Sequence, residues 1–347
     1  MNELNENIQI GIVGNGKMGT DILHYLANFN FRLVWLFKFD EEIEPAIKSF
    51  NKKQSRQFKN ELIDEANFNF RIENTVFTTK IEKLSDCDFI IEAIWENLEE
   101  KQLLFNSLDK IAKKECIFLS NSSSIKPSLI LKNTTRNQNF AALHFFYPVA
   151  YKNITEFIFT PETSEFTIKK VKELLKIINR EYLLLEEENA FILNKVFVDF
   201  QAVAYQITVQ ENLSFATIDN IIKDHIFPIG VFELFDNVGN EIIHFSISNY
   251  IEDFDDKSLY LPLLNKLQEL ISENKLGIKT KAGFYNYPLL PAEETIIDEV
   301  KIQEIIKVLN NHYENSAKAI IEKNICKKEE LNFAIKEYMG VENGPIF

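Results

Sequence analysis

The chain has 347 residues, of which 46% are hydrophobic and 26% are charged. This length suggests two domains, and the composition is that of an ordinary globular protein, which excludes fibrous, collagen-like and wholly disordered proteins. The net charge of -14 at pH 7 gives the protein a field that repels polyanions. We therefore expect no nucleic acid and no anionic membrane as its main partner.

The sequence predicts a soluble, cytoplasmic protein. No apolar run reaches the roughly 18 residues that a membrane span needs, and the polar start MNELNENIQI is unlike a secretory signal. The three cysteines, Cys87, Cys116 and Cys326, are scattered and odd in number. They predict neither a disulfide framework nor a metal site, and they suit a reducing compartment.

The first half of the chain alternates short apolar runs with amphipathic segments. Buried strands are expected at 8–13, 33–37, 89–93, 116–119, 140–145, 154–159 and 182–185. Helices are expected near 18–29, 41–65, 98–113, 127–131 and 164–178. This alternation predicts an α/β fold class, a doubly wound parallel sheet with helices on both faces.

Strand signals stop near residue 188, and a helix expected over about 191–210 opens an all-α second half. Within it the stretches 202–232 and 315–347 resemble each other, with Ala204 matching Ala317. The likeness is either chance similarity between amphipathic helices or a shortened second helical repeat. The predicted domains are a nucleotide-binding domain over 1–188, a helical domain over 189–290 and a shortened second repeat over 291–347.

Glycine is scarce but clustered. Only 10 glycines occur, and four of them, Gly11, Gly14, Gly16 and Gly19, lie within nine residues. Gly14, Gly16 and Gly19 form a GxGxxG pattern between the first strand and the first helix. In that setting the glycines give a tight turn, a close approach to a pyrophosphate and close helix packing, which predicts a Rossmann-type dinucleotide site.

The second strand lacks the carboxylate that should bind the adenosine ribose about 20 residues beyond the glycines. Phe37 occupies that position, followed by Lys38, with Asp40 three residues late. Either Asp40 reaches the ribose through a longer loop, or Lys38 favours a 2'-phosphate, or both are surface residues. Asp21, expected in the first turn of the helix, would suit the helix dipole but compete with a bound phosphate.

His144 differs from the other four histidines because it ends a predicted strand, at the edge where ligands of open α/β sheets collect. Glu156 follows twelve residues later, near the start of the next strand. A short return would bring its carboxylate to the imidazole, fix the tautomer and prepare a general base. Asn121–Ser124 and Asn194 are further polar candidates, although the first group also suits a helix cap and a lone amide also suits a packing role.

Taken together these residues resemble the L-3-hydroxyacyl-CoA dehydrogenase family over nearly the whole chain. The resemblance is carried by VGNGKMG, IEAIWENLEEK, SNSSSI, ALHFFYPV with the later Glu156, FILNK, PIGVFELFDNVG and LGIKTKAGFYNY, in the family's order. It implies a Rossmann-type domain followed by a helical domain, with the cofactor and a 3-hydroxyacyl thioester in the cleft between them. It also implies a role in fatty acid and acyl-CoA metabolism.

The resemblance assigns roles residue by residue. His144 is similar to the catalytic histidine that takes the proton from the 3-hydroxyl while hydride leaves for NAD, and Glu156 to its orienting partner. Ser123 and Asn194 match residues that bind the reacting oxygen and the thioester carbonyl. Glycine-loop residues and two charged residues match cofactor contacts, namely Gly14, Gly16, Lys17, Met18, Gly19, Glu96 and Lys101.

Two departures from the family accompany these matches. Tyr147 replaces the asparagine common after HFF, which implies a narrower pocket or another acyl group. Phe37 replaces the ribose-binding aspartate, which leaves NADP open beside NAD. The residues that would bind the CoA phosphates cannot be assigned from the sequence. One basic stretch is either a phosphate site or a solvated helix face, namely Lys52, Lys53, Arg56 and Lys59.

The function and the oligomeric state remain open. The chain is an acyl-CoA enzyme, or a dehydrogenase of a free hydroxy acid similar to L-gulonate dehydrogenase, or a non-catalytic acyl-CoA-binding relative. Its state is either monomer or homodimer. Family members with one helical domain dimerise through it, so the resemblance implies that a second helical copy would cover the face that a partner subunit otherwise covers.

Overall fold

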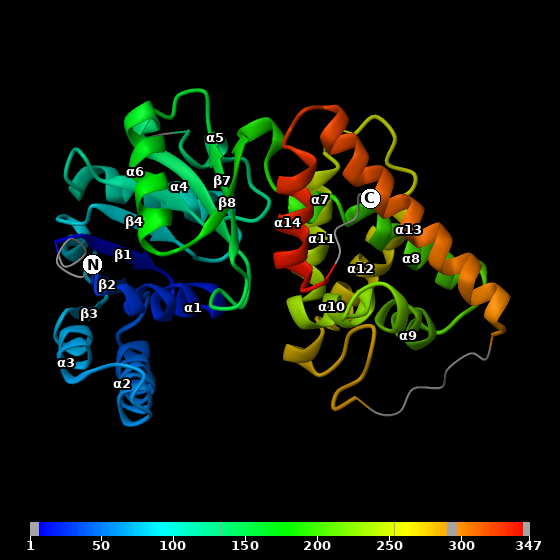
Figure 1. Ribbon diagram of the computed structural model, residues 1–347, viewed down its shortest axis with the longest axis horizontal. Helices are drawn as coiled ribbons and strands as arrows, with labels where there is room; N and C mark the ends of the chain where they lie inside the picture. Colours follow the sequence, from blue (N-terminus) through cyan, green and yellow to red (C-terminus); the bar gives the residue numbers. More distant parts are fainter. Residues whose placement is uncertain (1–6, 133, 253, 290–296, 343–347) are drawn as a thin grey trace. The chain divides into compact units, whose positions relative to one another are not determined.

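The structure, a computed structural model, describes residues 7–132, 134–252, 254–289 and 297–342. It divides the chain into two compact units, Met1–Ala190 and Phe191–Phe347 (Figure 1). The polar start of the chain at 1–6, and the residues 343–347 that would end the second repeat, lie outside the described residues.

The first unit is built on one eight-stranded sheet in the order β3-β2-β1-β4-β5-β6-β7-β8. The strands are β1 Gln9–Val13, β2 Arg32–Leu36, β3 Thr75–Thr78, β4 Phe89–Glu92, β5 Ile117–Ser120, β6 Phe140–Phe145, β7 Ile154–Phe159 and β8 Glu181–Glu186. Every neighbouring pair is parallel except β6 and β7. The order reverses at β1, and the carboxyl ends of β1 and β4 to β6 therefore meet at one edge, where open α/β sheets bind ligands.

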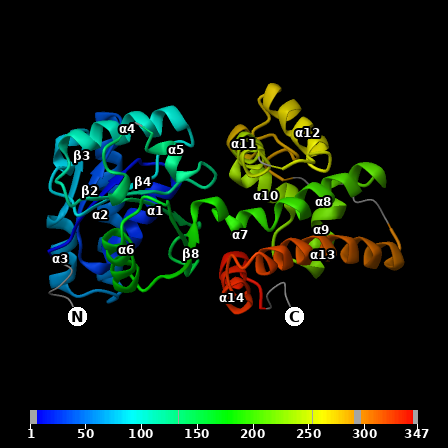
Figure 2. The same cartoon turned by 90° about the horizontal axis from the view of Figure 1, so that it is seen from above.

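Helices cover both faces of this sheet (Figure 2). They are α1 Lys17–Leu26, α2 Ile43–Lys59, α3 Glu65–Glu73, α4 Leu98–Ile111, α5 Pro127–Ile130 and α6 Glu165–Ile177. Side chains of α1, α2 and α6 share one buried cluster with alternate strand residues such as Ile12 and Trp35. Side chains of α4 and α5 share the other with Val13 and Val34. The expected doubly wound α/β fold is thus confirmed.

The sheet differs from the expected one in two places. Strand β7 runs antiparallel to β6, because only eight residues separate them and a parallel return needs a crossover of about a dozen residues. The strand β3 and the helix α3 were not expected, and the segment at 41–65 ends earlier, at Lys59. Strand β3 is four residues long and lies at the sheet edge, so it carries too little pattern to be recognised.

The second unit is helical. Its helices are α7 Ile192–Lys195, α8 Val198–Gln210, α9 Phe215–His225, α10 Val231–Val238, α11 Asn240–Tyr250, α12 Leu261–Ser272, α13 Glu299–Glu322 and α14 Lys328–Met339. The single helix expected over 191–210 is wrong, since it is divided into α7 and α8. At the break the Phe197 N–H donates to the Asn194 carbonyl, three residues earlier, in place of the four-residue spacing of an α-helix. No described helix is both long enough and apolar enough to span a bilayer.

The two stretches that resemble each other in sequence occupy corresponding helix pairs. Ala204 lies in α8 and Ala317 in α13, while Ile218 lies in α9 and Leu331 in α14. All four side chains are buried. Helix α13 packs along α8, and α14 packs against α7.

One histidine of the first unit is buried beside an aromatic ring. His24 of α1 stacks on Phe50 of α2, with ring centroids 5.8 Å apart. Its Nδ1 atom has no hydrogen-bond partner among the described residues. Burial lowers the pKa of His24 to about 4, and the charge of Lys53 adds to this effect.

We predict that His24→Phe reduces the loss of stability in acid. The unfolded chain binds a proton at this histidine below about pH 6.5, whereas the folded chain does so only near pH 4, so folding is penalised as pH falls through that window. The full effect is at most about 3 kcal/mol. Urea unfolding at pH 7.5 and at pH 4.5 measures the loss in free energy of unfolding between the two pH values. The exposed His225→Gln is the control variant. An equal loss of unfolding free energy in wild type and in His24→Phe would contradict the prediction.

Candidate active site

The glycine loop has the geometry of a phosphate cradle. Gly14 has a φ of +106°, and a Cβ atom there would lie 2.6 Å from the Ala93 carbonyl oxygen. A Cβ atom on Gly19 would lie 2.2 Å from the Gly14 carbonyl oxygen. A Cβ atom on Gly16 would meet nothing within 4 Å. The first and third glycines are therefore required by packing within the chain, while the second borders open space.

The first turn of α1 presents backbone N–H groups beside that space. Gly16 is the N-cap of α1, and no described side chain caps the helix. Uncapped N–H groups and the positive end of the helix dipole bind anions. The loop and the helix end thus fit the pyrophosphate of a dinucleotide.

A tryptophan that the sequence analysis did not single out holds this loop. The indole Nε1 of Trp35 in β2 donates to the Gly14 carbonyl oxygen at 2.9 Å, and the Gly14 N–H donates to the Leu36 carbonyl at 3.1 Å. Both polar groups of Gly14 are thereby fixed by β2. In the sequence, the only indication of this contact is a tryptophan two residues before Phe37, the expected ribose-binding position.

The end of β2 offers no carboxylate at the family position. Phe37 is 3% exposed and packs against Trp35, with centroids 4.6 Å apart, and against Phe77. Asp40 begins a short 3-10 helix and accepts a hydrogen bond from Thr79 Oγ1 at 2.6 Å. Lys38 and Asp40 are both exposed, so either remains able to face a nucleotide.

His144 and Glu156 stand directly opposite each other in the antiparallel pair β6 and β7. The His144 Nδ1 atom lies 2.8 Å from Glu156 Oε2. The glutamate is completely buried, and His144 is 5% exposed. An ionised carboxylate only accepts hydrogen bonds, so its partner in this contact would be an Nδ1–H group, with Nε2 as the other ring nitrogen. The strand register thus brings together the two side chains that the sequence predicts as a base and its orienting carboxylate.

The loop between β6 and β7 is tied to the start of α1. Val149 donates its N–H to Asp21 at 2.6 Å, and its carbonyl accepts from Arg180 at 2.7 Å. The Lys17 ammonium lies 4.0 Å from the centre of the Tyr147 ring. Asp21 lies beyond the first turn of α1, contrary to expectation. Its carboxylate accepts the hydrogen bond from this loop. The contacts bring the end of β6 close to the glycine loop.

A buried charge network organises the segment after β5. The Lys101 ammonium, on a side chain only 1% exposed, lies 2.6 Å from Glu92 Oε1 and 3.2 Å from Glu96 Oε2. Burial opposes its charge, but Glu92 and then Glu96 outweigh burial and raise the pKa of Lys101. Glu92, a carboxylate closing the apolar strand FIIE, was not among the predicted site residues.

Glu96 holds the serine-rich segment in place. Its Oε1 atom accepts from Ser122 Oγ at 2.6 Å and from the N–H groups of Ser123 and Ser124 at 3.0 and 3.1 Å. Burial opposes this charge too, yet Lys101 and the serine donors keep the pKa of Glu96 below its usual value. The predicted cofactor residues Glu96 and Lys101 therefore meet in one network with the predicted substrate residue Ser123.

Asn121 connects this segment to β6. Its side-chain oxygen accepts from the Phe145 N–H, next to His144, at 2.9 Å. Ser123 follows the end of β5, and His144 lies one residue before the end of its parallel neighbour β6, so both lie at the carboxyl edge of the sheet. The structure thus brings His144, Glu156 and the serine segment to one edge of the first unit.

Asn194 belongs to α7 in the second unit. Its Nδ2 atom donates to the hydroxyl of Tyr250 at 2.9 Å, and its Oδ1 atom accepts from the hydroxyl of Tyr338 at 2.9 Å. Neither tyrosine was predicted as a site residue. Phe191, just before α7, adopts a φ of +63°, a conformation that a bulky residue rarely takes.

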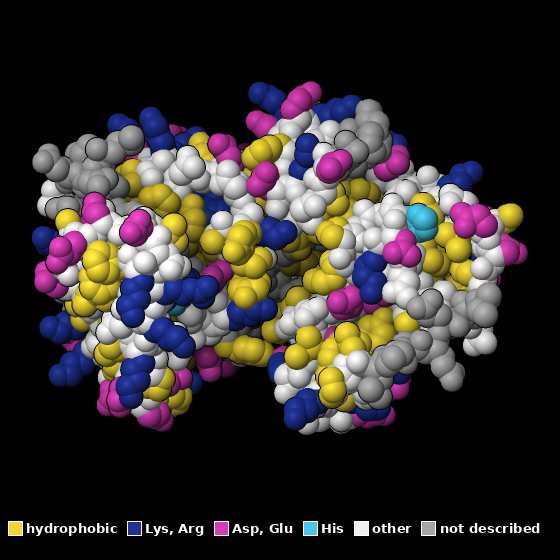
Figure 3. Space-filling view, turned by 60° about the horizontal axis from the view of Figure 1, so that its bottom comes forward, with side chains coloured by type: hydrophobic (Ala, Val, Ile, Leu, Met, Phe, Trp, Pro, Cys, Tyr) yellow, Lys and Arg dark blue, Asp and Glu magenta, His cyan; other side chains and the backbone are white. Residues whose placement is uncertain are grey.

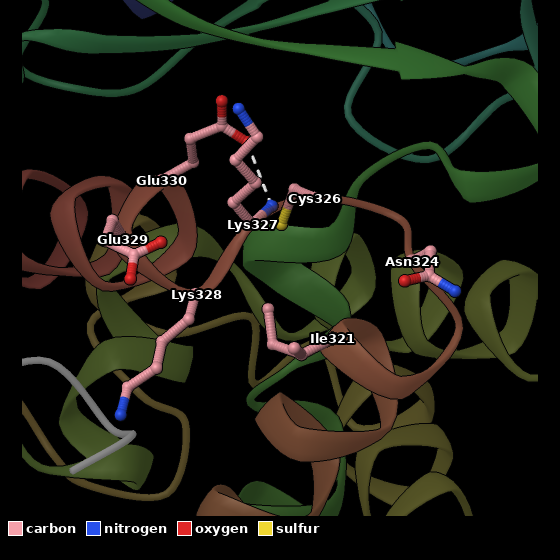
Figure 4. Close-up of a pocket in the computed structure, with 7 residues that line it drawn as sticks. All are labelled: Ile321, Asn324, Cys326, Lys327, Lys328, Glu329 and Glu330. Carbon is pink, nitrogen blue, oxygen red and sulfur yellow. Dashed lines mark hydrogen bonds between the residues drawn. The ribbon is translucent and has the colours of Figure 1, made fainter.

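Two other features contain none of the predicted catalytic residues. Lys and Arg side chains gather over α2, which carries Lys52, Lys53, Arg56 and Lys59 (Figure 3). A surface recess at the turn between α13 and α14 is lined by Asn324, Cys326 and charged residues of the start of α14 (Figure 4). In the described part of the chain, no cluster of three His, Cys, Asp or Glu side chains is suited to a metal ion.

Comparisons with known proteins identify the family. Residues 9–188 match the 3-hydroxyacyl-CoA dehydrogenase, NAD binding domain, and residues 191–287 match the 3-hydroxyacyl-CoA dehydrogenase, C-terminal domain. The mitochondrial hydroxyacyl-coenzyme A dehydrogenase of Homo sapiens is 31% identical over 285 residues, covering 80% of this chain and 90% of that protein. The chain therefore belongs to the 3-hydroxyacyl-CoA dehydrogenase family, which confirms the predicted family and the predicted cofactor, NAD.

Solved structures agree with this assignment. The (S)-3-hydroxybutyryl-CoA dehydrogenase of Ralstonia eutropha is 26% identical, with a TM-score of 0.72 over 80% of this chain and 98% of that one. The 3-hydroxybutyryl-CoA dehydrogenase of Escherichia coli K12 is 17% identical, with a TM-score of 0.82 over 97% of this chain and 90% of that one. The second match shows a shared fold that extends into the tail beyond residue 287.

We predict that Gly16→Ala weakens NAD binding without unfolding the protein. Gly16 has an ordinary φ of -66° and open space at its Cβ, so a methyl group would meet only the cofactor. The dissociation constant, measured by fluorescence titration, should rise at least about tenfold, or roughly 1.4 kcal/mol, with an unchanged melting temperature.

Gly19→Ala is the matched contrast. Its methyl group would press on the Gly14 carbonyl oxygen, and overpacking of this kind costs about 1–3 kcal/mol, so the melting temperature should fall. Wild-type NAD affinity in Gly16→Ala would show that the pyrophosphate lies elsewhere.

Proposed function

We propose that the protein reversibly oxidises an L-3-hydroxyacyl-CoA to the 3-oxoacyl-CoA with NAD. The observation that carries this proposal is the buried His144–Glu156 pair at the edge that also holds the glycine loop. The contacts of Val149 with Asp21 and of Tyr147 with Lys17 support a short path from this pair to the cofactor. The family relatives named for acyl-CoA substrates support the substrate class.

The proposed chemistry divides between cofactor and chain. NAD, held at the glycine loop, would supply the acceptor for the hydride of the substrate's C3. His144 accepts the proton of the 3-hydroxyl at Nε2, since its Nδ1 hydrogen is bound to Glu156. The Glu156 carboxylate then stabilises the imidazolium that forms. In the reverse direction the same nitrogen returns the proton to the 3-oxo oxygen.

Two neutral groups complete the proposal. Ser123, in the segment that Glu96 holds through backbone bonds, would donate to the reacting oxygen. Asn194 would donate to the thioester carbonyl and hold the substrate in position. Glu96 and Lys101 would act near the nicotinamide, with Lys101 contributing through Glu96 because its own ammonium is buried between two carboxylates.

The other interpretations make different predictions for the substrate and the cofactor. A free hydroxy acid dehydrogenase would reduce the free acid as well as its thioester. A non-catalytic relative would bind acetoacetyl-CoA without turnover, and Phe37, buried where the ribose carboxylate is missing, favours weak adenosine binding. The exposed Lys38 leaves NADPH as a cofactor to be compared with NADH.

We predict oxidation of NADH by acetoacetyl-CoA, with little turnover of free acetoacetate. His144→Gln should lower kcat by about 100- to 10,000-fold, the contribution of a general base. The glutamine keeps an amide donor for Glu156, so the buried carboxylate is not left alone as it would be with alanine. Absorbance at the NADH band measures the rate, with NADPH run in parallel.

His225→Gln, at the exposed end of α9, is the control and should keep wild-type turnover. Unchanged NADH affinity in His144→Gln would show that the loss lies in chemistry. Wild-type turnover in His144→Gln would remove His144 as the base, and preference for the free acid would favour the hydroxy acid branch.

We also propose that the chain is a monomer. Helix α13 packs along α8, and Ser316 of α13 donates to Asp199 of α8 at 2.7 Å. Tyr313 of α13 stacks on Phe197 with centroids 5.2 Å apart. These contacts support the view that the second helix pair takes the place of a partner subunit on the first.

Sedimentation velocity at micromolar concentration tests the state of the chain. We predict a single species near the chain mass of 40.5 kDa. A tight dimer would contradict the proposal; pairing through α8 in particular needs the face that α13 covers.

A further inference from the structure

The side chain of Asn194 is held at both ends by tyrosine hydroxyls. Tyr250, the last residue of α11, accepts from Asn194 Nδ2 at 2.9 Å. Tyr338, near the end of α14, donates to Asn194 Oδ1 at 2.9 Å. All three residues belong to the second unit, and Asn194 and Tyr338 are half-buried.

Tyr338 comes from the tail that lies beyond the family match, which ends at residue 287. Helix α14 begins after a sharp turn in which the Lys327 N–H donates to Glu330 Oε2 at 2.9 Å (Figure 4). Leu331, Ala334 and Ile335 of α14 are fully buried. The tail is thus packed firmly enough to fix the position of one hydroxyl.

A second set of contacts fixes α13 against α8. Asp199 accepts from Ser316 at 2.7 Å and from Tyr260 at 2.5 Å. The ring of Phe197 contacts both Tyr313 and Tyr338, with centroids 5.2 and 5.8 Å apart. Phe197 follows α7 by two residues, so the aromatic contacts and the Tyr338 hydrogen bond act on the same short segment.

The two hydrogen bonds hold the Asn194 amide in one place and one plane. An asparagine amide has an acceptor and a donor that exchange places when the group flips. Tyr338 donates to the oxygen, and Tyr250 accepts from one of the two amide hydrogens. A tyrosine hydroxyl can donate or accept, so the pair fixes the position and plane of the amide, and with the oxygen on Tyr338 the second N–H group is left for a ligand carbonyl.

We propose that Tyr338 is a positioning residue, by which the C-terminal tail orients the Asn194 amide toward the thioester carbonyl. The inference rests on the proposed function, because it needs Asn194 to bind substrate. It gives the tail a part in substrate binding in addition to its packing against α8. Tyr338 itself need not touch the substrate.

The test uses the full chain and removes one oxygen atom. Tyr338→Phe should lower kcat/KM for acetoacetyl-CoA by about tenfold, the effect of one well-placed hydrogen bond. The KM for NADH and the melting temperature should stay unchanged. Tyr313→Phe is the matched control, because its ring belongs to the same aromatic cluster and its buried hydroxyl has no partner among the described residues.

A double-mutant cycle separates positioning from general structure. If Tyr338 acts through the amide, Tyr338→Phe should have no further effect on kcat/KM once Asn194→Ala is present. Equal kcat/KM in wild type and Tyr338→Phe, or an equal loss in the Asn194→Ala background, would overturn the inference alone. Absence of turnover in the wild type would instead overturn the proposed function and this inference with it.

Discussion

A carboxylate buried in a sheet is destabilising unless a partner compensates it, and Glu156 is completely buried. Its partner His144 stands opposite it because β6 and β7 pair in antiparallel register. A shift of one residue would send the two side chains to opposite faces and leave the carboxylate alone. The requirement that stabilises this part of the sheet is therefore the same one that aligns the proposed base with its proposed orienting carboxylate.

The surrounding contacts protect that register. Arg180 binds the Val149 carbonyl, Asp21 binds the Val149 N–H, and Asn121 binds the backbone beside His144. A second buried network is formed by Glu92, Lys101 and Glu96. In it the Glu96 carboxylate accepts hydrogen bonds from backbone N–H groups of the serine segment and so holds that segment in place. Both networks give fixed dipoles and charges before a substrate arrives, which is the arrangement that electrostatic stabilisation of a transition state requires.

Much of this could be predicted from the sequence because the signals are local. The glycine loop, the buried strands and the order of strands and helices follow from spacing and periodicity, and the His144–Glu156 pair follows from two strand ends separated by a short return. The antiparallel step, the four-residue strand β3 and the break between α7 and α8 were missed, since none leaves a periodic pattern.

The residues that support the site were harder to find, because their partners are distant in sequence. Trp35 acts on Gly14 across 21 residues and Glu92 on Ser120 across 28. Tyr338 acts on Asn194 across 144 residues, from a tail that no family motif covers. Such pairs become visible only when the fold has been formed.

The tautomer of His144 decides whether this histidine can act as the base. Nitrogen-15 NMR of the protein labelled at histidine, with His144→Gln to assign the signals, follows both ring nitrogens across a pH titration. We expect Nδ1 to keep its hydrogen throughout, bound to Glu156, and Nε2 to be the nitrogen that exchanges the proton. A neutral ring with its hydrogen on Nε2 would contradict the assignment of His144 as the base.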